Sequence, residues 1–236
     1  MKFSIKRLYA IFQKDVKDIL KNLYVSTMIP VPLVLAFIAG RENNPPVEAH
    51  YVAINLTFVI ITAFLQCSII AEEKEKNTLR GLMLSPASTL EILGGKSLLT
   101  FLFTGVSIIL GMFVSGYQPA NIFIISIAIT VSIIFYIALG TLLGLMTKSV
   151  VEASVLIMPF LFIFGFGTFL QGYIDKHPVL SFVEYLPNIQ LVSLANEVEM
   201  AGGIADVWSQ LAVITMWAIV AGILVVTVYK RREMDK

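Results

Sequence analysis

The sequence predicts an all-α membrane protein with six membrane-spanning helices. Hydrophobic residues make up 57% of the chain and charged residues 14%, whereas typical soluble domains carry about 25% charged residues. The mean hydropathy is +0.85 over 236 residues. The apolar residues also fall in long runs, and about 20 such residues cross a bilayer as one helix. The single cysteine, Cys67, lies inside one of these runs, so we expect a buried packing residue and no disulfide within the chain.

The first 21 residues predict an amphipathic helix at the membrane surface. Apolar residues recur near the helical period over residues 1–21, and basic residues occupy the remaining arc. A helix of this kind lies in the plane of the interface, with its basic side chains toward anionic headgroups. One reading makes it a second contact surface for a cytosolic partner. The alternative is a plain basic flank of the first span.

Six apolar segments follow, and we expect each to span the membrane: residues 23–39, 51–70, 97–117, 122–146, 151–170 and 207–229. The first contains Pro30 and Pro32, which predict a kink or an unwound turn near residues 29–33. Gly140 and Gly144 in the fourth form a G-xxx-G pair, which allows two helices to approach closely.

One face of the second span is polar. Asn55, Thr62 and Gln66 lie at helix-compatible spacing. Such faces usually pack against neighbouring helices, where the polar side chains bond across the interface. The other interpretation is that the three residues line a substrate pathway or a seam between two subunits. The sequence leaves both open.

A polar stretch over residues 71–91 separates the second and third spans. Glu72 precedes Lys76 by four residues, the favourable order for an ion pair on a helix. Leu79, Leu82 and Met83 share one helical face, and Ser85-Pro86 ends the helix because proline disfavours α conformation in the residue before it. We therefore predict a short amphipathic helix at the membrane surface, suited to docking a soluble partner.

Residues 172–203 do not form a clean span. Charged residues and prolines interrupt the apolar pattern, leaving 179–186 and 189–195 too short to cross. We expect two short helices that dip back into the outer leaflet, with any irregular backbone buried in protein or lining a cavity. His50 and His177 are predicted to be lone histidines in polar loops, and no metal site is expected.

The basic residues predict the topology. With six spans, all but two of the 17 lysines and arginines fall on the face that carries both termini and residues 71–91. The exceptions are Arg41 and Lys176. The positive-inside rule places the basic face in the cytoplasm. We therefore expect one domain, residues 1–236, in the cytoplasmic membrane with both termini inside.

At residues 72–86 the sequence resembles a known family. The run EEKEKNTLRGLMLSP resembles the E-x-E-x-x-T-L-x-x-L-x-x-(S/T)-P stretch of ABC-2 type permeases, the membrane subunits of one class of ATP-driven exporters. The positions that match are Thr78, Leu79, Leu82, Ser85 and Pro86, whereas the first glutamate of the pattern aligns equally with Glu72, Glu73 or Glu75. The order of elements along the whole chain resembles the family too.

The resemblance implies a function and a set of partners. Residues 71–91 would be the coupling helix that docks into a separate ATPase subunit, through Glu72, Glu73, Glu75, Thr78, Leu79, Leu82, Met83, Ser85 and Pro86. Two ATPase copies would bind ATP and magnesium and drive two permease copies, which form a homodimer or a heterodimer with a similar permease. The pair would export a drug, peptide, lipid or similar amphiphile. The resemblance implies no cofactor in this chain and no nucleic acid partner.

Other functions fit the sequence less well. The chain lacks a G-xxxx-G-K-(S/T) phosphate loop, since Gly94-Gly95-Lys96-Ser97 has no glycine at the required earlier position, and we interpret it as a helix start. We expect no enzyme activity, because the spans hold no paired aspartates or histidine-rich spacing. An ion-coupled transporter would favour charged residues in mid-membrane, and the spans have none there. A membrane sensor or assembly factor remains as an alternative.

Overall fold

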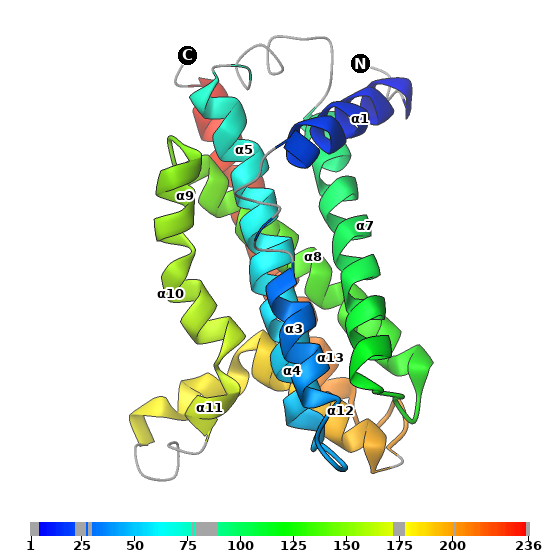
Figure 1. Cartoon of the computed structure of the whole chain (residues 1–236). Coiled ribbons are helices and arrows are strands. Elements are labelled where there is room, and N and C mark those ends of the chain that lie inside the picture. The colour runs from blue at the N-terminus through cyan, green and yellow to red at the C-terminus, as the bar shows by residue number, and fades with distance from the viewer. Residues whose placement is uncertain are drawn as a thin grey trace.

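The computed structural model describes residues 5–21, 27, 30–76, 78, 89–171, 178–200 and 202–234, and these form helices and turns without any strand. Long helices run side by side, and α1 (Ile5–Lys21) lies across one end of them (Figure 1). This part of the chain therefore has the all-α fold that the sequence predicted.

Four helices are long and apolar enough to cross a membrane: Val47–Glu75, Glu91–Ser115, Ile122–Met146 and Trp208–Arg231. They correspond to the second, third, fourth and sixth predicted spans. The elements that form them are α4 (Val47–Leu56), η1 (Thr57–Phe64), α5 (Leu65–Glu75), α7 (Thr89–Ser115), α8 (Ile122–Met146) and α13 (Trp208–Met234). The bounds of α8 are those predicted.

The second span is the axis of the bundle. Within its most apolar window 94% of residues are buried, against 17 to 44% in the other three long helices. The middle of this helix, η1, is a π-helical stretch, a wider winding that proteins use in short segments, often at functional sites. The axis also extends beyond the predicted residues 51–70 at both ends, because α4 begins at Val47 and α5 continues to Glu75.

The first and fifth predicted spans differ from single long helices. In the first, the structure describes α3 (Pro30–Ala39), which is helical from Pro30 onward, so the predicted unwinding is not found over residues 30–33. In the fifth, the chain is divided into short pieces: α9 (Val150–Leu156), α10 (Met158–Phe160), η2 (Leu161–Gly165) and α11 (Thr168–Gln171). A proline inside the segment explains part of this, since Pro159 has no N–H to donate along the helix.

Two short helices occupy the described part of residues 172–203, while their predicted place in the outer leaflet stays a prediction. They are a 3₁₀ helix, η4 (Pro178–Tyr185), and α12 (Pro187–Glu199), whose first residue is a proline. In Figure 1, α12 lies at the end of the bundle opposite α1. The carboxylate of Glu199 accepts hydrogen bonds from the Tyr117 hydroxyl (3.0 Å) and from the Ala120 N–H (3.3 Å), which fixes α12 to the turn after α7.

His50 is not in a polar loop, as we had expected. It lies in α4, it is buried, and its ring stacks on that of Tyr117 with centroids 4.9 Å apart. The sequence interpretation failed because the helix begins before the apolar run does. His177 lies outside the described residues.

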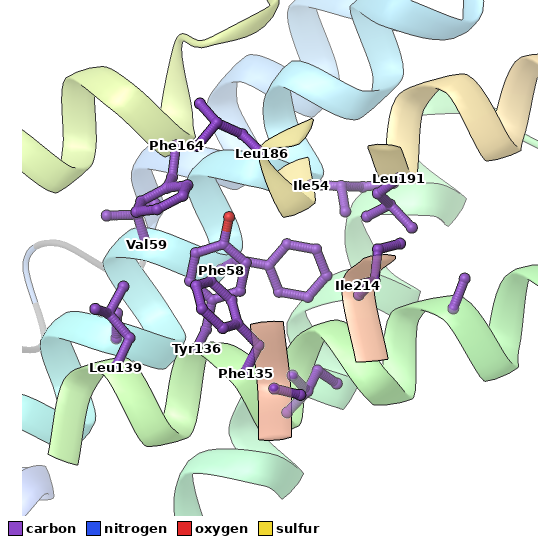
Figure 2. Packing of buried hydrophobic residues seen from close by; sticks show 14 of the residues in the cluster. Ile54, Phe58, Val59, Phe135, Tyr136, Leu139, Phe164, Leu186, Leu191 and Ile214 are labelled. Atoms are coloured by element: carbon purple, nitrogen blue, oxygen red, sulfur yellow. The ribbon is translucent and has the colours of Figure 1, made fainter. Parts of the chain in front are cut away.

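The core is aromatic where the axis meets α8. The rings of Phe58 and Tyr136 stack with centroids 5.0 Å apart and an interplanar angle of 4°. Phe135 and Phe164 meet each other edge-on at 5.8 Å, which brings η2 into the same cluster (Figure 2). Aromatic pairs contribute about 0.5–1.5 kcal/mol beyond the area they bury, so this cluster fixes how three helices pack.

The two glycines of α8 allow close contact with the axis, as the G-xxx-G pattern predicted. A Cβ atom on Gly140 would lie 2.9 Å from the Cβ of Gln66, and one on Gly144 would lie 2.8 Å from the carbonyl oxygen of Cys67. Real Cβ atoms essentially never approach backbone that closely. Cys67 is fully buried at this contact, so the packing role expected for it is confirmed.

We predict that Gly144→Ala lowers the free energy of unfolding by about 1–3 kcal/mol, because the added methyl group must push α5 and α8 apart. The measurement is thermal unfolding of the purified protein in detergent. Gly105→Ala is the matched control, because a Cβ at Gly105 meets nothing within 4 Å. Equal melting temperatures for the two variants would contradict the close contact.

Candidate functional site

The structure places the start of the predicted coupling segment at the end of the axis. The sequence predicted that a short helix begins at Ala71. In the structure, Ala71 to Glu75 are instead the last residues of α5, and Lys76 caps this helix. Thr78 is exposed, and its hydroxyl donates to the carbonyl oxygen of Glu73 at 3.3 Å. The remaining predicted docking residues lie outside the described part of the chain: Leu79, Leu82, Met83, Ser85 and Pro86.

The predicted ion pair of Glu72 and Lys76 is confirmed. The Lys76 ammonium lies 2.5 Å from a carboxylate oxygen of Glu72. The lysine side chain is 58% exposed, and exposed pairs of this spacing contribute about 0.3–0.5 kcal/mol. This pair supports the local helix and does little for the rest of the fold.

Next to it lies a buried charge cluster, which we define as Lys14, Asp15, Glu73 and Lys96. The Lys96 ammonium lies 2.9 Å from a carboxylate oxygen of Glu73 and 3.3 Å from one of Asp15. Lys14 approaches the same Glu73 oxygen at 2.6 Å from the solvent side. These four residues come from α1, α5 and α7, so the cluster joins the surface helix to two spans.

Burial makes this cluster energetically important. The Lys96 side chain is 0% exposed and that of Asp15 is 2% exposed. A buried ion costs several kcal/mol unless it is paired. Burial raises the pKa of Asp15 above its usual value, and this effect outweighs the opposing attraction of Lys96. The four formal charges cancel, and Lys96 supplies the fully buried cation of the cluster while Lys14 pairs with both carboxylates from the solvent side.

Lys74 points to a different neighbour, the carboxyl end of α8. Its ammonium donates to the carbonyl oxygen of Leu145 at 2.8 Å, and also contacts those of Gly144 and Thr147. The last carbonyl groups of a helix have no partner within the helix and carry partial negative charge. A lysine ammonium is therefore well matched to this position.

Glu75 reaches the first turn of α9. Its carboxylate accepts a hydrogen bond from the N–H of Val150 at 3.0 Å. The turn before α9 is closed by Ser149, whose hydroxyl accepts from the Glu152 N–H at 3.2 Å, while the Glu152 carboxylate accepts from the Lys148 N–H at 2.6 Å. Glu75 thus binds the N-terminus of α9, which Ser149 and Glu152 already cap.

The geometry of a helix explains how three consecutive charges reach three places. At 3.6 residues per turn, successive side chains of an α-helix point about 100° apart. Glu73 therefore faces α1 and α7, Lys74 faces α8, and Glu75 faces α9. The end of the axis is fixed on several sides by residues 73–75.

Sequence reasoning missed the roles of Asp15 and Lys96. We interpreted Gly94-Gly95-Lys96 as a helix start, whereas α7 begins at Thr89 and contains all three residues. A Cβ on Gly95 would lie 3.0 Å from the Leu8 carbonyl oxygen, so this glycine lets α1 lie directly on α7. A glycine pair beside a lysine within a helix was the available sign of this close crossing.

The polar face of the axis lies inside the subunit. Gln66 accepts from the Thr100 hydroxyl at 2.6 Å and donates to that of Thr141 at 3.0 Å, which bridges α7 and α8. The hydroxyls of Thr62 and Thr104 are 2.9 Å apart. Asn55 is fully buried, and its amide forms no hydrogen bond with any residue that the structure describes. This burial favours the packing interpretation of Thr62 and Gln66 over a pathway or a seam.

Comparison with known proteins gives the class. The chain has the long apolar helices of a multi-pass membrane protein, and ion pairs join α1 to the end of α5 and to α7. A family model described as ABC-2 family transporter protein matches residues 5–228. The chain therefore belongs to the ABC-2 transporter family, and it is an ABC-2 type permease. A search of curated proteins found no match.

We predict that Lys96→Met lowers the free energy of unfolding by about 3–5 kcal/mol, because two buried carboxylates lose their buried cation and keep the half-exposed Lys14. Adding Glu73→Gln removes one of those charges, so the double variant should recover part of the loss. The measurements are thermal unfolding and hydrogen exchange of α1, which should lose protection in Lys96→Met.

Lys17→Met is the control for that experiment, since Lys17 is an exposed lysine on α1. A Lys96→Met protein as stable as this control would contradict the role of the cluster. So would a double variant that is no more stable than the single one.

Proposed function

We propose that this chain is the permease subunit of an ABC exporter and that residues 71–91 receive the force of a separate ATPase subunit. The observation that carries the proposal is the fixed end of the axis. Glu73, Lys74 and Glu75 lie in the first part of the segment that resembles the family's coupling helix, and they contact α1, α7, α8 and α9. A force applied to that segment is therefore transmitted to α1, α7, α8 and α9 through residues that lie within one turn of α5.

The mechanism follows from rigid-body motion. In the proposed assembly, two ATPase copies bind ATP and magnesium, close on each other and move two permease copies. The axis is the most buried helix, and a packed core shifts between discrete arrangements and does not deform continuously. The axis and its neighbours would therefore tilt together and open or close a path between the two permeases.

The proposed orientation puts α1 in the cytoplasm. The end of the bundle that carries α1 also carries the ends of α5 and α13 and the start of α7 (Figure 1). Lysines and arginines gather at that end: among the described residues, Lys74, Lys76, Lys148 and Lys230 belong to it, while Arg41 lies at the other end. The positive-inside rule favours this orientation. Six spans remain our proposal, with α3 in the first and α9 to α11 in the fifth.

The segment η4–α12 would close the outer mouth. Besides the contacts of Glu199, the Asn196 amide donates to the Glu48 carboxylate at 2.7 Å, which ties α12 to the outer end of the axis. A cap tied to the axis moves with it. The proposed cargo is a drug, peptide, lipid or similar amphiphile.

Two functions other than ATP-driven export remain as alternatives. An ion-coupled transporter would work without an ATPase, and a membrane sensor or assembly factor would bind one without moving a substrate. Reconstitution with the ATPase separates the three, because only an exporter couples ATP turnover to movement of a compound across the bilayer.

We predict that Leu79→Asp or Leu82→Asp abolishes copurification with the ATPase subunit, because a carboxylate cannot be buried in an apolar contact without a partner. The measurement is the amount of ATPase recovered with the tagged permease. Met200→Asp is the control: Met200 is 80% exposed and follows α12, at the other end. If the leucine variants retain both the complex and its ATP turnover, residues 71–91 are not the coupling segment.

We also predict that Lys74→Met reduces transport by roughly tenfold, within the range of typical coupling free energies, while the ATPase still copurifies. Lys74 contacts the end of α8, so its loss should weaken transmission and leave docking intact. Lys76→Met is the control, because Lys76 is an exposed lysine two residues further on, and its ion pair with Glu72 lies within α5 and its cap. Equal transport by the two variants would contradict the proposed transmission.

A further inference from the structure

A cavity of about 440 Å³ lies between α7, α8 and α13. Its lining is almost entirely apolar and includes Leu98, Phe101, Ile134, Ile137, Gly222 and Val226. Small-molecule sites typically have volumes of roughly 300–1,000 Å³, so this cavity is large enough for a ligand. It is separate from the charge cluster, and it borders the hydrogen bonds of Gln66 at Thr141.

The cavity is long in the direction of the helices. It is lined from Leu93 to Phe101 on α7 and from Ile134 to Thr141 on α8. At 1.5 Å per residue, these stretches measure about 12 Å and about 10 Å. The hydrocarbon core of a bilayer is about 30 Å thick, so one leaflet contributes about 15 Å. A slot of this length matches most of one acyl chain lying along the membrane normal.

The slot opens sideways toward the lipid. Ile134 is 50% exposed and Val226 is 48% exposed, although both line the cavity. Gly222 contributes to the space, because a Cβ there would meet nothing within 4 Å. A lipid chain can therefore enter from the bilayer without any movement of the helices.

Positive charge lies at one end of the slot. The lining residues of α13 are Gly222, Val225 and Val226. Lys230 follows Val226 by four residues, so it continues the same face of the helix one turn further on. Lys230 is exposed. An ammonium group beyond the end of an apolar slot is matched to a phosphate headgroup whose acyl chain fills the slot.

We propose that this cavity binds an anionic phospholipid, with one acyl chain between α7, α8 and α13 and its phosphate at Lys230. The leaflet follows from the position of the slot at the end of the bundle that carries α1, and it is the cytoplasmic leaflet if the proposed orientation holds. The site itself does not depend on the function proposed above. A bound lipid at this position holds the cytoplasmic ends of three spans together.

The test is photolabelling of the full chain in phosphatidylcholine vesicles that contain phosphatidylglycerol with a diazirine on its acyl chain. Labelled peptides should come from α7, α8 and α13. Gly222→Phe fills the slot and should reduce this labelling roughly tenfold, equivalent to about 1.4 kcal/mol of affinity. Gly105→Phe is the matched control, because Gly105 is also open on α7 but does not line the cavity.

A second arm tests the headgroup. Lys230→Gln should reduce the preference for phosphatidylglycerol over phosphatidylcholine by roughly fivefold, since a basic residue near a membrane surface contributes about 1 kcal/mol. Total labelling of the slot by a matching phosphatidylcholine probe should stay unchanged. A preference that survives Lys230→Gln would overturn the headgroup assignment.

Three outcomes would overturn the site. If the lipid probe labels Gly222→Phe and Gly105→Phe to the same extent, the labelled lipid belongs to the general lipid shell around the protein and not to a specific site. Labelling confined to other helices has the same consequence. If a crosslinker placed at Ile134 captures a second copy of the chain, that copy covers the slot. Copurification of the ATPase with Gly222→Phe, measured in parallel, keeps this result separate from the test of the proposed function.

Discussion

The structure depends on the buried ammonium group of Lys96. An ion without solvent is tolerated only when opposite charges surround it, and here those charges come from two other helices, through Asp15 on α1 and Glu73 on α5. The requirement to neutralise one lysine therefore fixes the relative positions of three elements. Hydrophobic contacts of Ile11 and Leu8 on the same side add area to this crossing, but the charges determine its register, because an apolar contact tolerates a shift that an ion pair does not.

From this point the rest of the bundle is ordered around the axis. The glycines of α8 bring its backbone against α5, and the aromatic rings of Phe58, Tyr136 and Phe164 fill the space one to two turns further along. Between the glycines and the aromatic rings, Gln66 on α5 forms hydrogen bonds with Thr141 on α8 and Thr100 on α7. A helix held by ions at one end and by close packing along its length moves with its neighbours, which is the property that a transporter driven from one end requires.

Much of the fold follows from the sequence, and the exceptions share a physical cause. The bounds of α8 and the close approach at Gly144 were predictable because both depend on a local pattern. The role of Lys96 was not, since its partners lie far away in the chain and a lysine near a loop ordinarily faces water. His50 was misjudged because a helix continues beyond its apolar run when tertiary packing covers the polar residues. The interruptions of the fifth span are explained in part by Pro159, which is visible in the sequence, whereas the exact division into α9, α10, η2 and α11 is not.

The separation between Asp15 and Lys96 along the chain has a consequence for biogenesis. The two residues are 81 positions apart, and ribosomes add about 5–20 residues per second, so α1 waits about 4 to 16 seconds for its buried partner. During that interval α1 lacks its ion pairs with Lys96 and Glu73. The ion pairs can form only after α5 and α7 have been synthesised and inserted. They are therefore late contacts, and they form only when these helices have taken their correct positions beside α1.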